Sequence, residues 1–349
     1  MFKRVLVANR GEIAVRVIRA LRGMGIPSVA VYSKEDQDSL HGRLAEERVC
    51  IGEGSSRNSY LNMDTLITVA KNTGCDAIHP GYGFLSENAQ FAEKCRENDI
   101  CFIGPSPEVI DGMGNKSQAR AKMREAGVPV VPGSLKALYD VKEALEEAKA
   151  MGFPVMIKAS SGGGGKGMRE CFSEGDFENE FLTAQRESAN AFSDDAMYLE
   201  KLILEPRHVE VQIMGDSYGH VVALGERDCS IQRNHQKLVE ESPSPAVSEK
   251  TRKAMMEAAV KAAASVRYTG AGTIEFIMDK DGQFYFMEMN TRVQVEHPVT
   301  EFVTGVDIVK EQIKIAAGQE LSVTQEDIVF KGHAIECRIN AENPAFNFA

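Results

Sequence analysis

The 349-residue sequence predicts an α/β protein in which a doubly wound parallel sheet is followed by α+β domains with antiparallel sheets. Two patterns carry this prediction. Over roughly the first 110 residues, short apolar runs alternate with segments of helical periodicity, the order expected of a parallel sheet covered by helices. Further along, apolar runs follow one another through short turns, which favours antiparallel pairing. The pattern changes between residues 113 and 134.

The first part is predicted element by element from these periodicities. Strands are expected over residues 4–10, 27–33, 75–81 and 100–106, and helices over residues 11–25, 60–74 and 89–99. Gly25 and Gly74 follow the first two helices, as is common where a helix ends. This order of strand and helix predicts parallel strands joined by helical crossovers.

The second part begins with two helices, over residues 115–126 and 140–152, and the latter starts with a D-x-x-E pattern. Strands are expected at 153–160, 196–204, 207–215 and 220–226, a long helix at 249–270, and a strand hairpin at 270–290. No internal repeat or low-complexity segment interrupts these elements.

Composition limits the class of protein. The chain has 40 Lys and Arg against 51 Asp and Glu, a net charge of −11, which argues against a nucleic-acid-binding surface. No apolar run is long enough to span a membrane, and the N-terminus lacks the pattern of a signal peptide. Seven scattered cysteines without CxxC spacing indicate reduced thiols and a cytoplasmic protein. Among them, Cys229 is interpreted as a packing residue rather than a nucleophile.

The stretch KASSGGGGKGM, residues 158–168, indicates phosphate binding, since bare backbone amides and lysines can surround an anion. It is not a P-loop, because Lys166 is followed by Gly167 instead of Ser or Thr. It also fits a dinucleotide-binding turn poorly, because its glycines are contiguous. Lys158 ends an apolar strand beside the glycines and is a candidate phosphate ligand. Lys116 is a weaker candidate, since an isolated lysine is more often a surface residue.

A metal site is predicted from a hairpin. Asp281-Gly282 between two alternating apolar runs indicates a two-residue turn, which pairs residue 280 with 283 and therefore Glu275 with Glu288. Two facing carboxylates repel each other unless a cation lies between them. Oxygen ligands favour magnesium or manganese.

The strand after this turn is expected to continue with period two to residue 296. Its polar side chains would then share one face: Glu288, Asn290, Arg292, Gln294 and Glu296. The alternative is an exposed strand face with incidental ion pairs. Both signs of charge in step with the facing glutamates favour a site.

Residues 225–243 form a second cluster, interpreted as a loop-like segment that holds phosphate or a small anion. Its polar side chains include Arg227, Gln232, Arg233, His235 and Lys237. A solvated basic loop is an equally good interpretation. Residues 200–202 lie on an apolar strand of the kind that can bind adenine through backbone groups.

These motifs resemble the ATP-grasp enzymes, and more closely the biotin carboxylases. The resemblance is carried by VLVANRGEIAVRVIRA (5–20), HPGYGFLSEN (79–88), FIGPSPEVIDGMGNKSQAR (102–120), SSGGGGKGMR (160–169), GERDCSIQRNHQK (225–237), MEMNTRVQVEHPVTE (287–301) and GHAIECRINAE (332–342). It covers essentially the whole chain. RVQVEHPVTE is the most discriminating run.

The resemblance implies a role for each candidate residue. ATP phosphates would contact Lys116 and Lys158 beneath a lid formed by Gly162, Gly163, Gly164 and Gly165. Adenine and ribose would be bound by Glu200, Lys201, Leu202, His208, Gln232 and His235. Two metal ions would be held by Glu275, Glu288 and Asn290. Bicarbonate would be held by Lys237, Arg292, Gln294 and the backbone of Val295, with Glu296 as general base. Biotin would lie against Arg338 and Tyr82.

The implied reaction is ATP-dependent carboxylation of biotin on a carboxyl carrier protein, with bicarbonate, through carboxyphosphate. A carboxyltransferase component would use the product, and the family forms homodimers. The resemblance divides the chain into a pre-ATP-grasp domain (1–113), a helical linker (114–134), a lid subdomain (135–203) and a large subdomain with the start of a C-terminal lobe (204–349). Because the family pattern continues past residue 342, we expect a C-terminally truncated chain.

Several alternatives stay open. The acyl acceptor could be that of acetyl-CoA carboxylase in fatty acid synthesis, or that of a pyruvate or propionyl-CoA carboxylase. A biotin-independent ATP-grasp ligase is the nearest other enzyme. A non-catalytic nucleotide-binding module is the alternative of another class, and it predicts nucleotide binding without turnover.

Overall fold

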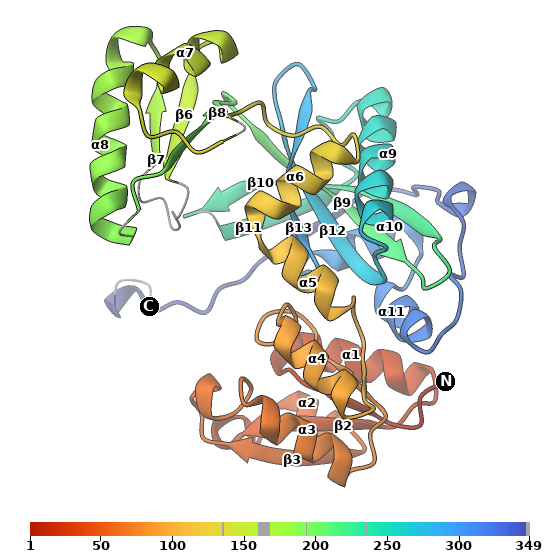
Figure 1. The fold of residues 1–349 in the computed structure, drawn as a ribbon. Coiled ribbons are helices and arrows are strands. Elements are labelled where there is room, and N and C mark those ends of the chain that lie inside the picture. The colour runs from red at the N-terminus through yellow and green to blue at the C-terminus, as the bar shows by residue number, and fades with distance from the viewer. Residues whose placement is uncertain (135, 160–167, 193, 235, 347–349) are drawn as a thin grey trace. The chain divides into compact units, whose positions relative to one another are not determined.

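The computed structural model describes residues 1–349 except 135, 160–167, 193, 235 and 347–349 (Figure 1). For Lys116, Ser117, Ala191, Phe192 and Phe346 it describes the backbone alone. The chain forms two compact units. The first comprises residues 1–129, 207–278 and 282–349, and the second comprises residues 130–206 and 279–281. The predicted α/β class is confirmed, whereas the four-part domain division stays a prediction.

The N-terminal part of the first unit is a five-stranded parallel sheet with strand order β3-β2-β1-β4-β5. Its strands are β1 (Val5–Val7), β2 (Ser28–Ser33), β3 (Glu47–Gly52), β4 (Ala77–His79) and β5 (Cys101–Phe102). Its helices are α1 (Gly11–Gly23), α2 (Leu40–Leu44), α3 (Met63–Asn72) and α4 (Ala89–Glu97), with short 3-10 turns at Lys34–Asp36 and Ser56–Asn58. The predicted parallel arrangement is confirmed, and β3 is an additional strand.

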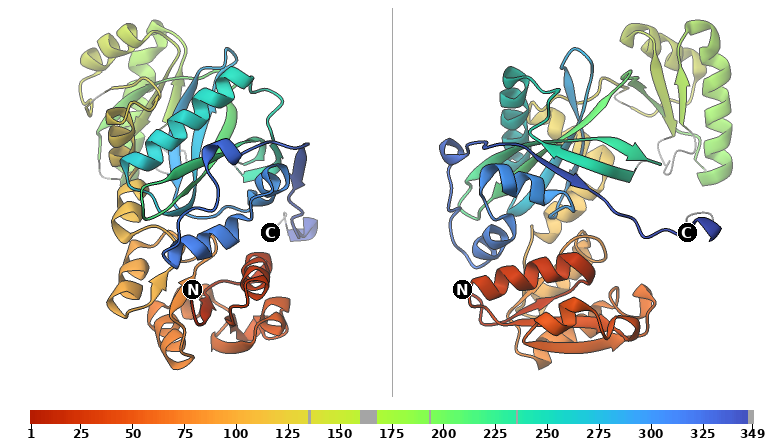
Figure 2. Two further views of the ribbon diagram at one scale, coloured as in Figure 1. Left: turned by 90° about the vertical axis from the view of Figure 1, so that its right-hand side faces the viewer. Right: turned by 180° about the vertical axis from the view of Figure 1, so that it is seen from behind.

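Both faces of this sheet are apolar because helices cover both (Figures 1 and 2). Successive residues of β1 point to opposite faces, so Val5 and Val7 join one core with α1 while Leu6 joins another with α3 and α4. The core beside α1 continues into Met214, Ala271 and other residues of the following part of the unit.

That following part is a six-stranded antiparallel sheet with strand order β13-β12-β9-β10-β11-β14. Its strands are β9 (Arg207–Gly215), β10 (Val221–Arg233), β11 (Gln236–Ser242), β12 (Gly270–Met278), β13 (Phe284–Asn290) and β14 (Ala334–Cys337). The accompanying helices are α5 (Pro107–Gly114), α6 (Lys116–Glu125), α9 (Glu249–Ser265), α10 (His297–Thr304) and α11 (Ile308–Ala316), with 3-10 turns at Gln325–Asp327 and Pro344–Phe346.

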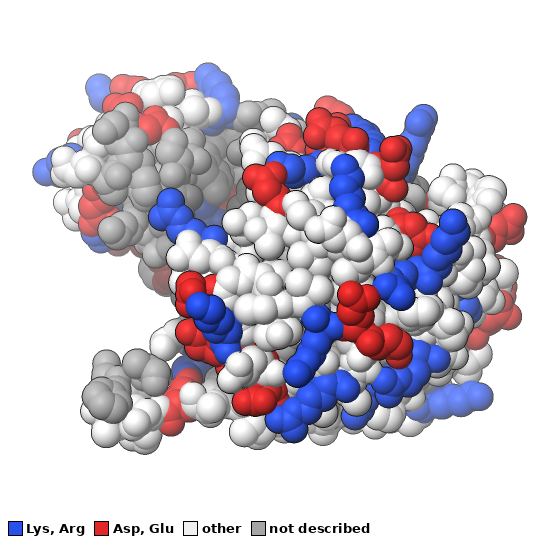
Figure 3. Space-filling view, turned by 90° about the horizontal axis from the view of Figure 1, so that it is seen from below, with Lys and Arg blue, Asp and Glu red and all other residues white. Residues whose placement is uncertain are grey.

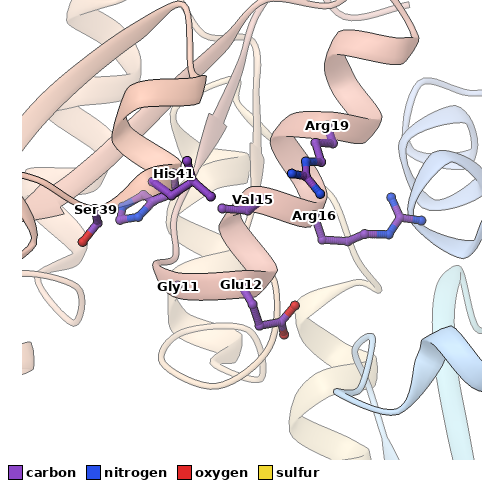
Figure 4. Close-up of a pocket in the computed structure, with 8 residues that line it drawn as sticks. Gly11, Glu12, Val15, Arg16, Arg19, Ser39 and His41 are labelled. Carbon is purple, nitrogen blue, oxygen red and sulfur yellow. The ribbon is translucent and has the colours of Figure 1, made fainter. Parts of the chain in front are cut away.

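Arg16 joins α1 to α10 and to the residue that caps α11. Its guanidinium donates to Glu301 Oε1 over 2.9 Å and to Asp307 Oδ1 over 2.7 Å. Figure 4 shows this side chain extending from α1 away from Ser39 and His41. Together with the shared apolar core, the contact ties the parallel sheet to the antiparallel sheet within one unit.

The second unit is a three-stranded antiparallel sheet with strand order β7-β6-β8 and two helices. Its elements are α7 (Val141–Met151), β6 (Val155–Ala159), β7 (Met168–Cys171), α8 (Glu174–Phe192) and β8 (Met197–Lys201). Asp140 caps α7 by accepting from the backbone amides of Lys142 and Glu143, as the sequence pattern predicts. The antiparallel pairing is also confirmed.

None of the helices among the described residues is both long and apolar enough to cross a membrane.

Candidate active site

One face of the six-stranded sheet carries buried charges. On β9, Glu210 and Gln212 alternate with Val209, Val211 and Ile213, and all five are fully buried. The antiparallel register sets Glu210 opposite Glu275 of β12. On the other side of β12, Glu275 is opposite Glu288 of β13. Three glutamates therefore lie in a row across three adjacent strands, which requires cations nearby.

Lys237 of β11 is the first of these cations. Its Nζ donates to Glu210 Oε2 over 2.5 Å, to Glu275 Oε1 over 2.9 Å and to Glu296 Oε1 over 2.8 Å. Burial opposes its charge, but the surrounding carboxylates raise the pKa of Lys237 above its usual range. One ammonium group therefore draws three carboxylates from separate elements into a single cluster.

Arg227 of β10 is the second cation and is fully buried. Its guanidinium donates to Glu210 Oε1 over 2.7 Å and to Gln294 Oε1 over 2.8 Å. Its remaining partners are Gln212 Oε1, Thr273 Oγ1 and Thr300 Oγ1. Because the guanidinium is charged, these hydrogen bonds are strong, and Arg227 holds the side chains of its partners in place. Glu210 was not among the predicted site residues, although the period-two pattern of β9 carries the signal.

Glu275 has partners on several elements of the cluster. It accepts from Asn290 Nδ2 over 2.8 Å and from Gln294 Nε2 over 3.0 Å. His208 Nε2 lies 2.9 Å from its second oxygen. Burial alone would raise the pKa of Glu275, but His208 and Lys237 hold it well below its usual range. The group is therefore a carboxylate at neutral pH.

The predicted metal ligands fit a divalent cation by their donor atoms. Glu275 and Asn290 are already joined by a hydrogen bond, and Glu288 is the cross-strand partner of Glu275. Two carboxylates and an amide oxygen form the oxygen-only set that Mg²⁺ and Mn²⁺ prefer. His208, Glu210 and Glu275 also converge closely enough to share an ion.

In the hairpin, the predicted pairing of Glu275 with Glu288 is confirmed, but the predicted turn is wrong. The pair nearest the turn is Met278 with Phe284, so the turn is longer than the predicted Asp281-Gly282 dipeptide. A register shift between Glu275 and Phe276 then brings Glu275 opposite Glu288. A β-bulge of this kind inserts one residue on one strand, and it cancels the error in the predicted turn.

The strand predicted to run to residue 296 ends at Asn290, so the period-two argument is wrong beyond that point. Residues 291–296 form a loop, and this loop brings Gln294 and Glu296 to the cluster without the alternation of a strand. Gln294 contacts Glu275, and Glu296 contacts Lys237. Arg292 donates to Glu87 Oε2 over 2.7 Å and to Asn290 Oδ1 over 3.1 Å.

Arg338 follows β14 and extends the cluster. It donates to Glu296 Oε2 over 3.0 Å and to Glu240 Oε1 over 2.6 Å, so Glu296 lies between two cations. Burial raises the pKa of the nearby Glu336 to about 7. Tyr82, from the loop after β4, donates to Glu12, and burial is the main cause of its raised pKa.

The segment predicted as an anion-binding loop is instead a pair of strands. Residues 225–233 belong to β10 and residues 236–242 to β11. Gln232 Nε2 lies 2.9 Å from His208 Nδ1, while His235 lies outside the described residues. Cys229 is buried and its pKa is raised well above 9.0 by burial, in keeping with a packing role.

The remaining nucleotide-binding candidates belong to the second unit or to α6. Lys158 of β6 forms an ion pair with Glu200 of β8. Lys201 Nζ donates to the carbonyls of Gly152 and Phe153, over 2.8 and 3.1 Å. The amide of Leu202 donates to the carbonyl of Pro154. Lys116 is the first residue of α6, and Gly162, Gly163, Gly164 and Gly165 lie outside the described residues.

A surface pocket of about 530 Å³ lies elsewhere, against α1 and α2 (Figure 4). Its lining residues are Gly11, Glu12, Val15, Arg16, Arg19, Ser39, Leu40 and His41. No predicted site residue is among them.

On the face shown in Figure 3, basic and acidic side chains are intermixed.

A parallel N-terminal sheet and two antiparallel sheets, with a buried carboxylate and lysine cluster on one of them, match the architecture that the resemblance to ATP-grasp enzymes implies. Residues 1–110 match the family described as biotin carboxylase, N-terminal domain, and residues 115–324 match the carbamoyl-phosphate synthase L chain, ATP binding domain.

Named relatives narrow this class. Biotin carboxylase 1 of Bacillus subtilis is 58% identical over the whole chain, which spans 78% of that relative. A pyruvate carboxylase subunit of Methanothermobacter thermautotrophicus is 52% identical over the whole chain, which spans 71% of it. The chain belongs to the biotin carboxylase family and is an ATP-grasp ligase.

Solved structures of biotin carboxylases are similar to this chain over nearly its whole length. A biotin carboxylase domain of a thermophilic 2-oxoglutarate carboxylase bound to bicarbonate matches with a TM-score of 0.95 and 51% identity, covering 100% of this chain and 77% of that one. The Campylobacter jejuni biotin carboxylase–beta-gamma-ATP complex matches with a TM-score of 0.88 and 51% identity, covering 98% and 77%.

Proposed function

We propose that this protein carboxylates biotin on a carrier protein, using ATP and bicarbonate, through a carboxyphosphate intermediate. The observation that carries the proposal is the contact of Lys237 with Glu210, Glu275 and Glu296, in a cluster that also includes Arg338. The cluster contains a cation that can bind an oxyanion, a candidate base in the loop of residues 291–296, and candidate metal ligands on one face of the six-stranded sheet.

Bicarbonate would be bound by Lys237, Arg292, Gln294 and the backbone of Val295, with Glu296 as general base. Both oxygens of Glu296 are hydrogen-bonded to cations, Lys237 over 2.8 Å and Arg338 over 3.0 Å. These contacts hold the carboxylate in one orientation, so that it can accept a proton from bound bicarbonate. The resulting anion would attack the terminal phosphate of ATP, forming carboxyphosphate and releasing ADP.

Mg²⁺ or Mn²⁺ would be held by Glu275, Glu288 and Asn290. When bound, such an ion would neutralise the negative charge of the phosphate oxygens. His208 and Lys237 contact Glu275 and keep it ionised, which is the form that binds a metal.

ATP would be bound by the following residues. The proposed phosphate ligands are Lys116, Lys158 and the backbone of Gly162, Gly163, Gly164 and Gly165. The proposed adenine and ribose ligands are Glu200, Lys201, Leu202, His208, Gln232 and His235. The ion pair between Lys158 and Glu200 supports this assignment, because it keeps a lysine ammonium beside the polar end of β8.

Biotin would lie near Arg338 and Tyr82. After carboxyphosphate breaks down, its phosphate would take the proton from biotin N1, and the guanidinium of Arg338 would stabilise the biotin enolate that attacks carbon dioxide. The hydrogen bond from Arg338 to Glu296 supports the assignment of Arg338 to the same site as the proposed base.

The proposed partners are a biotin carboxyl carrier protein, a carboxyltransferase component and a second copy of the chain. We assign the protein to the cytoplasm, in keeping with seven free cysteines. Acetyl-CoA carboxylase in fatty acid synthesis is the preferred context; the matched relatives include biotin carboxylases, at up to 58% identity, and a pyruvate carboxylase subunit, at 52%. Pyruvate or propionyl-CoA carboxylation is the alternative.

The proposal is tested by following radioactive bicarbonate into biotin. Purified protein is incubated with Mg²⁺, ATP, labelled bicarbonate and free biotin, and acid-labile carboxybiotin is measured. Label should appear in biotin only when ATP is present. ATP binding without label transfer would favour a nucleotide-binding module instead.

A further inference from the structure

His297 is a buried side chain that the proposed mechanism does not use. It is the first residue of α10, directly after Glu296, and only 1% of it is exposed. Its Nδ1 lies 2.8 Å from the carbonyl oxygen of Gln294. Its backbone amide donates to the same oxygen over 3.3 Å. The imidazole therefore closes a turn that contains Gln294, Val295 and Glu296.

The contact defines how the imidazole is protonated. A carbonyl oxygen can only accept, so Nδ1 carries the hydrogen. Burial lowers the pKa of His297 to about 4, which leaves the ring neutral and Nε2 without a hydrogen. Nε2 has no hydrogen-bond partner within the part of the chain that the structure describes. The directional contact of this ring is therefore made through Nδ1.

Gln294 is the residue on which this contact acts, and it is held at both ends. Its side-chain oxygen accepts from Arg227 over 2.8 Å, and its side-chain nitrogen donates to Glu275 over 3.0 Å. Its main-chain carbonyl is held by His297. Rotation of the 294–295 peptide would redirect the amide of Val295 and displace Glu296.

We propose that His297 is a positioning residue that fixes the bicarbonate-binding loop, residues 292–296, through the hydrogen bond from Nδ1 to the carbonyl of Gln294. This role rests on the proposed function of the loop. His297 does not touch substrate. It holds the backbone that presents one proposed bicarbonate ligand, Val295, and the proposed base, Glu296.

Two substitutions of His297 separate this role from simple packing. In His297→Asn, the amide nitrogen can occupy the place of Nδ1 and donate to the carbonyl of Gln294. In His297→Gln, the amide nitrogen reaches the place of Nε2 instead. The two variants are both polar and uncharged, so they differ mainly in which ring nitrogen they replace.

The kinetic readout is phosphate release as bicarbonate and ATP are varied separately. We expect His297→Gln to lower kcat/KM for bicarbonate about tenfold, the size of one lost hydrogen bond, and to leave the KM for ATP within about twofold. His297→Asn should remain within about threefold of the wild type. Equal losses in both variants, or an equal rise in the KM for ATP, would overturn the proposal.

A second measurement uses the wild-type chain and does not depend on how the variants fold. Nitrogen-15 NMR of histidine-labelled protein reports which ring nitrogen carries the hydrogen, and the chain has only seven histidines to assign. We expect neutral His297 with the hydrogen on Nδ1. A hydrogen on Nε2 would reject the contact itself. The expected tautomer in a protein without bicarbonate-dependent turnover would instead reject the proposed function.

Discussion

Two strands of the first unit, β1 and β9, differ in the kind of side chain that they bury. All three residues of β1 are apolar and fully buried. On β9, Val209 and Val211 face one side while Glu210 and Gln212, also fully buried, face the other. Burying a Leu or Val side chain contributes about 2 kcal/mol to stability, whereas a buried carboxylate costs several kcal/mol before its partners compensate. Stability alone therefore does not explain the polar face of β9, whereas a role of its side chains in the candidate site does.

The largest expected effect that tests this comparison comes from Glu296→Gln. The amide keeps the size of the side chain but cannot accept a proton as a base. Bicarbonate-dependent phosphate release should fall at least about 100-fold, as for loss of a general base. The affinity for ATP, measured by calorimetry, should stay unchanged. An equal loss of ATP affinity would mean that Glu296 has another role.

A smaller effect on turnover is expected for Glu288→Gln, because the metal site loses one of its two carboxylates. The Mg²⁺ concentration needed for half-maximal turnover should rise about tenfold or more. Glu257→Gln, on the exposed side of α9, is the matched control and should leave the titration unchanged. If the two variants titrate alike, Glu288 is not a ligand.

Leu6→Ala, unlike the substitutions in the candidate site, should lower stability and leave turnover nearly unchanged. Leu6 is fully buried in the core between the parallel sheet and α3 and α4. Its truncation should lower the free energy of unfolding by about 3 kcal/mol, measured by urea denaturation. Turnover of the folded variant should remain within about twofold of the wild type. A large loss of turnover at unchanged stability would break the division between scaffold and site.

The smallest effect concerns Asp36, a buried carboxylate of the scaffold. Arg10 donates to it over 2.5 and 2.6 Å and Tyr60 over 2.6 Å. The hydrogen bonds from Arg10 are the main reason why the pKa of Asp36 lies far below its ordinary value of 3.8. This stabilisation is therefore complete above pH 3.8 and is lost as the pH falls further.

Asp36→Asn should accordingly lower the free energy of unfolding by about 1 to 2 kcal/mol at pH 7 and reduce its decline below pH 4. Urea denaturation at a series of pH values measures both. Turnover at pH 7 should not change, since Asp36 lies outside the candidate site. An unaltered acid decline in the variant would show that Asp36 does not contribute to it.

The contrast between the apolar scaffold and the polar site also explains how much of the structure the sequence could predict. The parallel sheet followed from local periodicity, because each strand and helix there carries its own apolar pattern. The pairing of Glu275 with Glu288 was correct, although a longer turn and a bulge produced it. The run from Arg292 to Glu296 is predicted as a strand because its polar residues recur at every second position, although the segment is a loop whose side chains converge.

The period-two pattern of β9 marks Glu210 as part of a polar face, but its pairing with Glu275 and the contacts of Arg227 depend on strand order, which local patterns do not contain. Glu210 meets Glu275 only because β9 pairs with β12, and the two residues are 65 positions apart in sequence order. Arg227 links β10 to Gln294 and Thr300 in the same way. The resemblance to biotin carboxylases supplied the ligand roles, which the residues alone left open.

The most direct test of the central claim is the rate of phosphate release from ATP by the 349-residue chain as bicarbonate is varied, with and without free biotin. If Lys237 and the loop of residues 292–296 form the bicarbonate site, the rate should rise to saturation with bicarbonate and increase further with biotin. A Lys237→Met variant should lose this dependence. A rate that is the same without bicarbonate, in both proteins, would contradict the account.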